Sequence, residues 1–209
     1  MPDRPQSPTE WIDGFLFVGN HLALDFLNTK PILDDGPKEF LPDVRALERW
    51  LAASGLLASP KAKATVRRWR DSNEARALLR EILAFRERLR TTIIRHEAGE
   101  AIADAFIAEV NRLLQAHPCR VVLRKAGAKF KRETVFEPQE PADVWSPIVA
   151  AVAELIADVP ALRIRKCESC VVHFYDISKK GSRRWCSMNI CGNKIKVAAY
   201  QARNRAAEK

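Results

Sequence analysis

The sequence predicts a mainly α-helical body with a small β-hairpin or sheet, an α+β body, followed by a C-terminal four-cysteine zinc finger of the treble-clef type. Apolar residues recur at helical spacing through the first 160 residues, and four of the five cysteines lie in the last 49. Residues 1–160 carry 23 basic and 23 acidic side chains, whereas residues 161–209 carry 12 and 3, which is the entire net charge of +9. We therefore expect a disordered N-terminus over 1–10, a body over 11–160 and a finger over 161–209.

The composition excludes several classes of protein. Hydrophobic residues make up 47% of the chain and charged residues 29%, which is typical of globular domains and unlike a disordered chain. No apolar run approaches the roughly 18 residues that a membrane span needs. The first ten residues contain three prolines and no apolar secretion signal. We expect a soluble cytoplasmic protein.

Capping signals mark the expected helix starts of the body. A short polar side chain at the N-cap accepts a hydrogen bond from a free backbone N–H of the first turn, and proline is favoured immediately after it. Residues 31–42, which begin with a proline, are expected to form a loop. The expected caps are Asn20 before a helix over 21–28, Asp43 before a helix ending near Gly55, Ser59 before Pro60, and Ser146 before Pro147.

The middle of the chain predicts two longer helices and a hairpin. Apolar residues at helical spacing predict an amphipathic helix over 74–97 and a second helix from Ile102 to Leu114, ended by Pro118. Two β-rich runs, 120–125 and 129–136, flank Ala126–Gly127–Ala128 and predict a β-hairpin.

The last 49 residues carry a metal-binding pattern. Cys167 and Cys170 have the C-x2-C spacing of a zinc knuckle, and Cys186 and Cys191 follow fifteen residues later. Residues 171–184 are expected to form a hairpin that returns the chain to the metal, and residues 193–207 a helix. Because four thiolates close the coordination shell, we expect one structural zinc ion rather than a catalytic one. His173 is a less favoured alternative ligand, and Cys119 is expected to be an inert core thiol.

Two motifs resemble a known family. Cys191-Gly192-Asn193-Lys194, after Trp185-Cys186, resembles the motif of the CGNR zinc finger. Leu22-Ala23-Leu24-Asp25-Phe26-Leu27-Asn28-Thr29 resembles the signature of the ABATE domain, its usual N-terminal partner. The resemblance covers nearly the whole chain and implies a stress-induced transcription regulator whose finger binds DNA. The family has Arg where this chain has Lys194, which keeps the charge but loses a planar bidentate donor.

Basic residues of the finger are the candidate nucleic-acid contacts. Several of them are expected to contact phosphates, and on the expected C-terminal helix Arg203 and Asn204 could also contact base edges. We expect DNA as the partner, with RNA as the second choice, because Phe174, Tyr175 and Trp185 could stack on bases. The alternatives are an RNA-binding or translation-linked factor and a non-enzymatic protein-interaction module. The candidate contacts are Lys179, Lys180, Arg183, Arg184, Lys194, Lys196, Arg203 and Arg205.

A polar stripe in the body is the second candidate site. His21, Asp25, Asn28 and the adjoining Thr29 lie along an otherwise apolar helix. His21, Asp25 and Asn28 could bind a small polar ligand. Alternatively, Asp25 and Asn28 could hold the 31–42 loop in place, which we favour. Catalysis is not expected, because no nucleophile accompanies this His–Asp pair, and we find neither a phosphate-binding loop nor a zinc-protease motif. A homodimer would form through the helical body.

Overall fold

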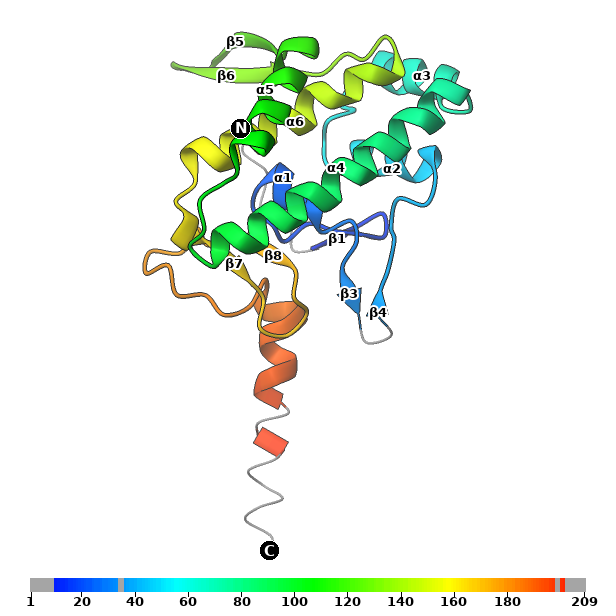
Figure 1. Ribbon diagram of the computed structural model, residues 1–209. Helices are drawn as coiled ribbons and strands as arrows, with labels where there is room; N and C mark the ends of the chain where they lie inside the picture. The colour runs from blue at the N-terminus through cyan, green and yellow to red at the C-terminus, as the bar shows by residue number, and fades with distance from the viewer. Residues whose placement is uncertain (1–9, 34–35, 198–199, 202–209) are drawn as a thin grey trace, which may run out of the picture.

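The computed structural model describes residues 10–33, 36–197 and 200–201 (Figure 1). The segment 1–9, most of the expected disordered N-terminus, lies outside the described residues, as do Arg203, Asn204 and Arg205. The described part contains six α-helices in the body, four two-stranded antiparallel sheets and a C-terminal helical segment over 193–197. The helical body lies above the β7–β8 hairpin in Figure 1, and the C-terminal helix projects away from both.

The body is built on six helices, and a side-chain N-cap marks the start of the first four, α1 to α4. Asp43, Ser59 and Ser72 each accept a hydrogen bond from the backbone N–H three residues later, at 2.8–3.1 Å. The long helix α4 and the apolar helix α6 pack on α1, which is almost completely buried between them. The helices are α1 (Leu22–Leu27), α2 (Val44–Ala53), α3 (Pro60–Trp69), α4 (Asn73–Glu97), α5 (Asp104–Ala116) and α6 (Trp145–Asp158).

The strands form hairpins rather than a continuous sheet. The β5–β6 hairpin is confirmed, with Ala126 opposite Lys129 and a two-residue turn at Gly127–Ala128. The short β1–β2 hairpin precedes α1, the short β3–β4 hairpin follows it and occupies part of the expected 31–42 loop, and the fourth hairpin lies in the finger. The strands are β1 (Trp11–Ile12), β2 (Phe15–Leu16), β3 (Ile32–Leu33), β4 (Gly36–Pro37), β5 (Arg120–Ala126), β6 (Lys129–Val135), β7 (Ile164–Lys166) and β8 (His173–Tyr175).

Two expected helix starts were wrong. The cap of α1 is His21 rather than Asn20, since Nδ1 of His21 accepts the N–H of Ala23 at 3.3 Å while Asn20 has a left-handed backbone with φ of 54°. Helix α6 begins before Ser146, because a 3-10 turn (Pro141–Val144) leads directly into it. The Ser146 hydroxyl instead donates to the carbonyl of Pro118.

The described residues have two separate apolar cores. The larger core fills the helical body around Phe26, Trp50 and Phe85. The smaller core lies in the finger and combines Val172, Phe174 and three of the cysteines with Leu16 and Val18 from the N-terminal segment. Residues before α1 therefore complete the packing of the finger. None of the described helices is both long enough and apolar enough to cross a membrane.

Candidate metal centre and its contact with the body

The zinc knuckle is the turn of the β7–β8 hairpin. Antiparallel pairing of Ile164 with Tyr175 and of Lys166 with His173 brings the chain around Cys167 and Cys170. The N–H of Cys167 donates to the carbonyl of Val172 at 2.8 Å, and its own carbonyl accepts the N–H of Val171. The expected hairpin within 171–184 is therefore wrong in its pairing. Strand β8 pairs with the strand before the first cysteine, because the C-x2-C turn itself reverses the chain.

The second cysteine pair enters the site from a helix start. Ser187 caps a π-helical turn (Met188–Gly192), and its hydroxyl oxygen accepts the N–H groups of Asn189 and Ile190. This turn carries Cys191 toward Cys186, and α-helix continues from residue 193 to 197. A Cβ on Gly192 would lie 2.6 Å from the sulfur of Met188 and 3.3 Å from the ring of Trp185, so only glycine fits there without displacing a side chain.

The four sulfurs match the geometry of one zinc ion. All four lie within 4.8 Å of one another, with 3.5 Å between Cys170 and Cys186 and 3.7 Å between Cys186 and Cys191. A tetrahedral zinc–thiolate site with Zn–S near 2.3 Å separates its sulfurs by about 3.8 Å. A disulfide requires about 2.05 Å, and all five cysteines are free. The protein therefore holds one structural zinc ion at Cys167, Cys170, Cys186 and Cys191.

The sulfurs need a cation if all of them are to ionise. Hydrogen bonds from the thiols of Cys170 and Cys186 lower the pKa of Cys167, so one thiolate is favoured even without metal. The hydrogen bond to the Cys167 thiolate raises the pKa of Cys170 to about 12 and also raises the pKa of Cys186, because a thiol that donates to a thiolate keeps its proton; at Cys186, repulsion from the neighbouring sulfurs adds to this effect. Zinc removes this repulsion, which couples metal binding to folding of the finger.

The loop between β8 and Cys186 is organised around Asp176. Its buried carboxylate accepts the N–H of Ser178 at 2.9 Å and the N–H of Arg183 at 2.8 Å. Burial raises the pKa of Asp176, but these hydrogen bonds outweigh it, and the pKa is lowered overall. Arg163 reaches the carbonyls of Asp176 and Ser178, and Arg165 reaches that of Gly181. The loop is thus held by hydrogen bonds from its own Asp176 and from Arg163 and Arg165, which precede the first cysteine.

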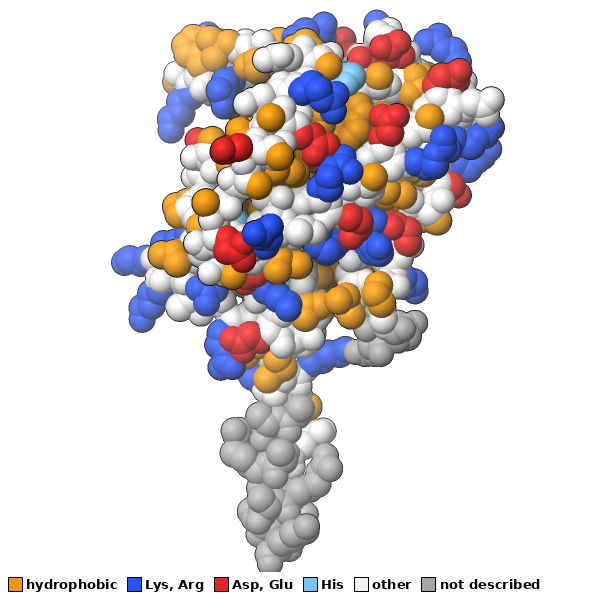
Figure 2. All heavy atoms as spheres, viewed as in Figure 1, with side chains coloured by type: hydrophobic (Ala, Val, Ile, Leu, Met, Phe, Trp, Pro, Cys, Tyr) orange, Lys and Arg blue, Asp and Glu red, His pale blue; other side chains and the backbone are white. Residues whose placement is uncertain are grey.

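The predicted nucleic-acid residues fall into two groups in the described part. Arg183 has a structural environment, since its guanidinium lies 4.9 Å from the ring of Phe174 and donates to the carbonyl of Cys186. Arg184 pairs with Glu168 at 2.6 Å. Four cations are exposed and have no ion-pair partner among the described residues: Lys179, Lys180, Lys194 and Lys196. Figure 2 shows Lys and Arg side chains gathered around the finger.

The polar stripe of α1 is buried and bonded to protein. Asp25 accepts the N–H of Gly19 at 2.8 Å, and a Cβ on Gly19 would lie only 2.8 Å from the backbone nitrogen of Asp25. Thr29 donates to the carbonyl of Phe26 and accepts from Arg86, which is itself buried and pairs with Glu39. Burial lowers the pKa of His21 to about 4.

Asn28 connects the body to the finger. Its amide oxygen accepts the N–H of His173 at 3.0 Å, and its amide nitrogen donates to the carbonyl of His173 at 2.8 Å. The backbone of Tyr175 is bonded in a similar way. Its N–H donates to the carbonyl of Gly19 at 2.8 Å, and its carbonyl accepts from the side-chain amide of Asn20 at 2.9 Å. The free edge of β8 is thus hydrogen-bonded by residues 19–28. The expectation that Asn28 holds the 31–42 loop is wrong, because both ends of its amide are used on the finger.

The C-terminal end of helix α4 also contacts this junction. Oε1 of Glu97 accepts the N–H of Lys166 at 2.8 Å, and Oε2 lies 3.4 Å from Nε2 of the buried His173. Burial lowers the pKa of His173, and the ring is not among the metal-binding groups. Arg90 donates to the carbonyls of Leu27 and Lys30, which lie at the C-terminal end of α1 and just beyond. Finger and body therefore meet through hydrogen bonds, and those between the side chain of Asn28 and the backbone of His173 are buried.

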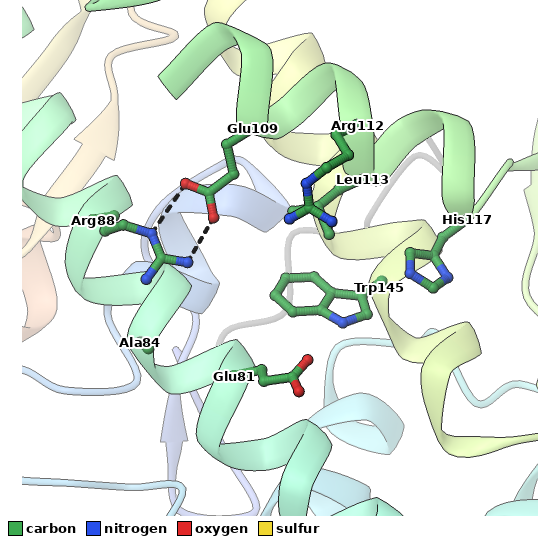
Figure 3. Close-up of a pocket in the computed structure, with 8 residues that line it drawn as sticks. All are labelled: Glu81, Ala84, Arg88, Glu109, Arg112, Leu113, His117 and Trp145. Carbon is green, nitrogen blue, oxygen red and sulfur yellow. Dashed lines mark hydrogen bonds and ion pairs between the residues drawn. The ribbon is translucent and has the colours of Figure 1, made fainter. Parts of the chain in front are cut away.

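A groove of about 330 Å³ lies in the body between α4, α5 and the start of α6 (Figure 3). Trp145 forms its floor and stacks against His117, with ring centroids 6.5 Å apart. Arg88 and Glu109 face each other across one side in a 2.6 Å ion pair. None of the residues of the polar stripe lines this groove.

Comparison with family models identifies the chain. The ABATE model, described as "Putative stress-induced transcription regulator", matches residues 20–159, and the CGNR zinc-finger model matches residues 163–204. The chain therefore belongs to the ABATE family and carries a C-terminal CGNR zinc finger. Comparison with curated proteins finds no match. Both families are regulatory or zinc-finger families rather than enzyme families.

Proposed function

We propose that the protein is a DNA-binding transcription regulator, in which the zinc finger supplies basic contacts to duplex DNA. The observation that carries this proposal is a set of four lysines that are exposed and have no ion-pair partner in the part of the chain that the structure describes: Lys179, Lys180, Lys194 and Lys196. With one zinc ion and four thiolates, the formal charge of residues 161–209 falls from +9 to +7, which still favours a polyanion. Arg183 and Arg184 belong to the same surface, but their bonds to Cys186 and Glu168 make them poorer phosphate ligands.

The helical body has a positioning role in this proposal. Because Asn28, Gly19 and Asn20 hold β8, the finger has a fixed orientation relative to α1 and α4. One finger offers few base contacts, so sequence-specific binding calls for a homodimer through the body. The groove at Trp145 is of the size that binds small ligands and is the site we propose for signal recognition.

A binding selection tests the proposal. Zinc-loaded full-length protein is incubated with a random duplex DNA pool near physiological salt, and with a single-stranded RNA pool in parallel. We expect enrichment of a duplex motif, and a palindrome would indicate a dimer. Enrichment only in the RNA pool would favour the translation-linked alternative. Retention of neither pool would exclude nucleic acid and leave protein interaction.

A further inference from the structure

The β5–β6 hairpin, which we call the ribbon, projects from the helical body at the end opposite the finger (Figure 1). Its two seven-residue strands pair along their full length from Arg120–Val135 to Ala126–Lys129. Gly127, with φ of 62°, allows the two-residue turn. An isolated two-stranded hairpin is only marginally stable in water, so an unpartnered one in a folded protein calls for a reason.

One face of the ribbon is entirely exposed. Register places six side chains on this face, and none of them is buried against the body. Three are large and apolar, with exposed fractions of 50% for Val121, 71% for Leu123 and 70% for Phe130. The other three are Lys125, Arg132 and Thr134. A face that combines large apolar and cationic side chains in full contact with solvent is typical of an interaction surface.

The ribbon is strongly basic although the body as a whole is neutral. Residues 120–135 contain six Lys or Arg and one acidic residue, Glu133. Arg120 pairs with Glu137 at 2.7 Å and Arg124 with Glu133 at 2.6 Å. The remaining cations have no ion-pair partner among the residues that the structure describes: Lys125, Lys129, Lys131 and Arg132. Two copies of this face would repel each other, so the charge fits a polyanion better than a second copy.

We propose that the ribbon is a second duplex-DNA-binding element, and that one chain can bridge two duplex segments. A two-stranded β-ribbon fits the major groove, where Lys and Arg contact phosphates and apolar side chains contact thymine methyl groups. Leu123 and Phe130 lie on the exposed face for such contacts. Because ribbon and finger lie at opposite ends of the protein, both cannot readily contact one straight duplex segment. The inference rests on the proposed function of the finger.

A bridging assay tests the ribbon. One duplex of roughly three helical turns is fixed to beads, and capture of a second, fluorescent duplex is measured with zinc-loaded full-length protein. The ribbon variant replaces Lys125, Lys129, Lys131 and Arg132 with Ala. A charge-matched control replaces four exposed cations of α3 and α4 with Ala: Lys61, Lys63, Arg68 and Arg80. Light scattering measures the oligomeric state of every variant, and circular dichroism its folding.

The outcomes separate the ribbon from the finger. We expect wild type and the control to capture the second duplex, and the ribbon variant to capture about tenfold less while still binding the bead-fixed duplex. Equal capture by ribbon variant and control would overturn the inference and leave the proposed function intact. Binding of no duplex by wild type would overturn both. A dimeric wild type that becomes monomeric with the ribbon variant would also overturn it, because the face would then join two copies.

Discussion

Replacing Asn28 with Ala tests whether the body holds the finger. The substitution removes both hydrogen bonds to His173 and leaves a buried backbone N–H and C=O without a partner. Each buried group left unsatisfied costs about 1–3 kcal/mol, so we expect the two groups together to lower the free energy of unfolding by about 2–6 kcal/mol. Urea unfolding of zinc-loaded protein, followed by tryptophan fluorescence, measures this loss.

Two controls make the result specific. Asn111 is an exposed asparagine on α5, and Asn111→Ala should change the stability by no more than about 0.5 kcal/mol. Asn28→Asp keeps an acceptor for the N–H of His173 but loses the donor to its carbonyl, so it should also destabilise. Amide exchange at His173 should accelerate in both Asn28 variants. A loss below about 0.5 kcal/mol with unchanged exchange would refute the role of Asn28.

Three further predictions concern zinc, charge and pH. Cys167→Ser should abolish zinc binding and unfold the finger, while the helical circular dichroism of the body persists. The control variant Cys119→Ser should keep one zinc ion per chain. Equal zinc content in the two variants would contradict the proposed ligands. Arg86→Met should cost about 3–5 kcal/mol in urea unfolding, because it leaves Glu39 without its buried partner; a change below about 1 kcal/mol would show that the pair is dispensable. The pKa of His21 is lowered to about 4, so the unfolded chain binds this proton first as pH falls, and stability should drop by about 2 kcal/mol from pH 7 to pH 5. His21→Asn keeps the helix cap and should remove that part of the slope; identical pH profiles would exclude His21 as its source.

Local signals explain which elements could be predicted. The caps at Asp43 and Ser59 depend on residues three positions apart, and each cysteine pair lies within a single turn of the chain. Such short-range patterns are visible in the sequence, so these elements could be predicted from it. Helix α6 begins before the predicted cap at Ser146, because a 3-10 turn continues directly into it. A 3-10 turn has a weaker sequence signal than a capped α-helix. The order of the two family motifs predicted the family correctly.

Contacts distant in sequence explain what could not be predicted. Asn28 and His173 are 145 residues apart, so nothing in either segment shows that they pair. The ribbon was predicted as a hairpin, but the neutral charge of the whole body concealed its local excess of cations. The contacts of Arg183 with the ring of Phe174 and the carbonyl of Cys186 depend on the folded loop around Asp176. The sequence alone does not show how this loop folds.

The salt dependence of DNA binding tests the central claim, that the zinc finger contacts duplex DNA. The affinity of zinc-loaded full-length protein for a duplex is measured by fluorescence anisotropy at increasing salt, for wild type and for Lys179→Ala/Lys180→Ala. Each phosphate contact contributes about 0.9 to the slope of log affinity against log salt, so the double variant should lower the slope by about 1.8. Chelation of zinc should abolish the contribution of the finger. An equal slope for both proteins, unchanged by the chelator, would contradict the account.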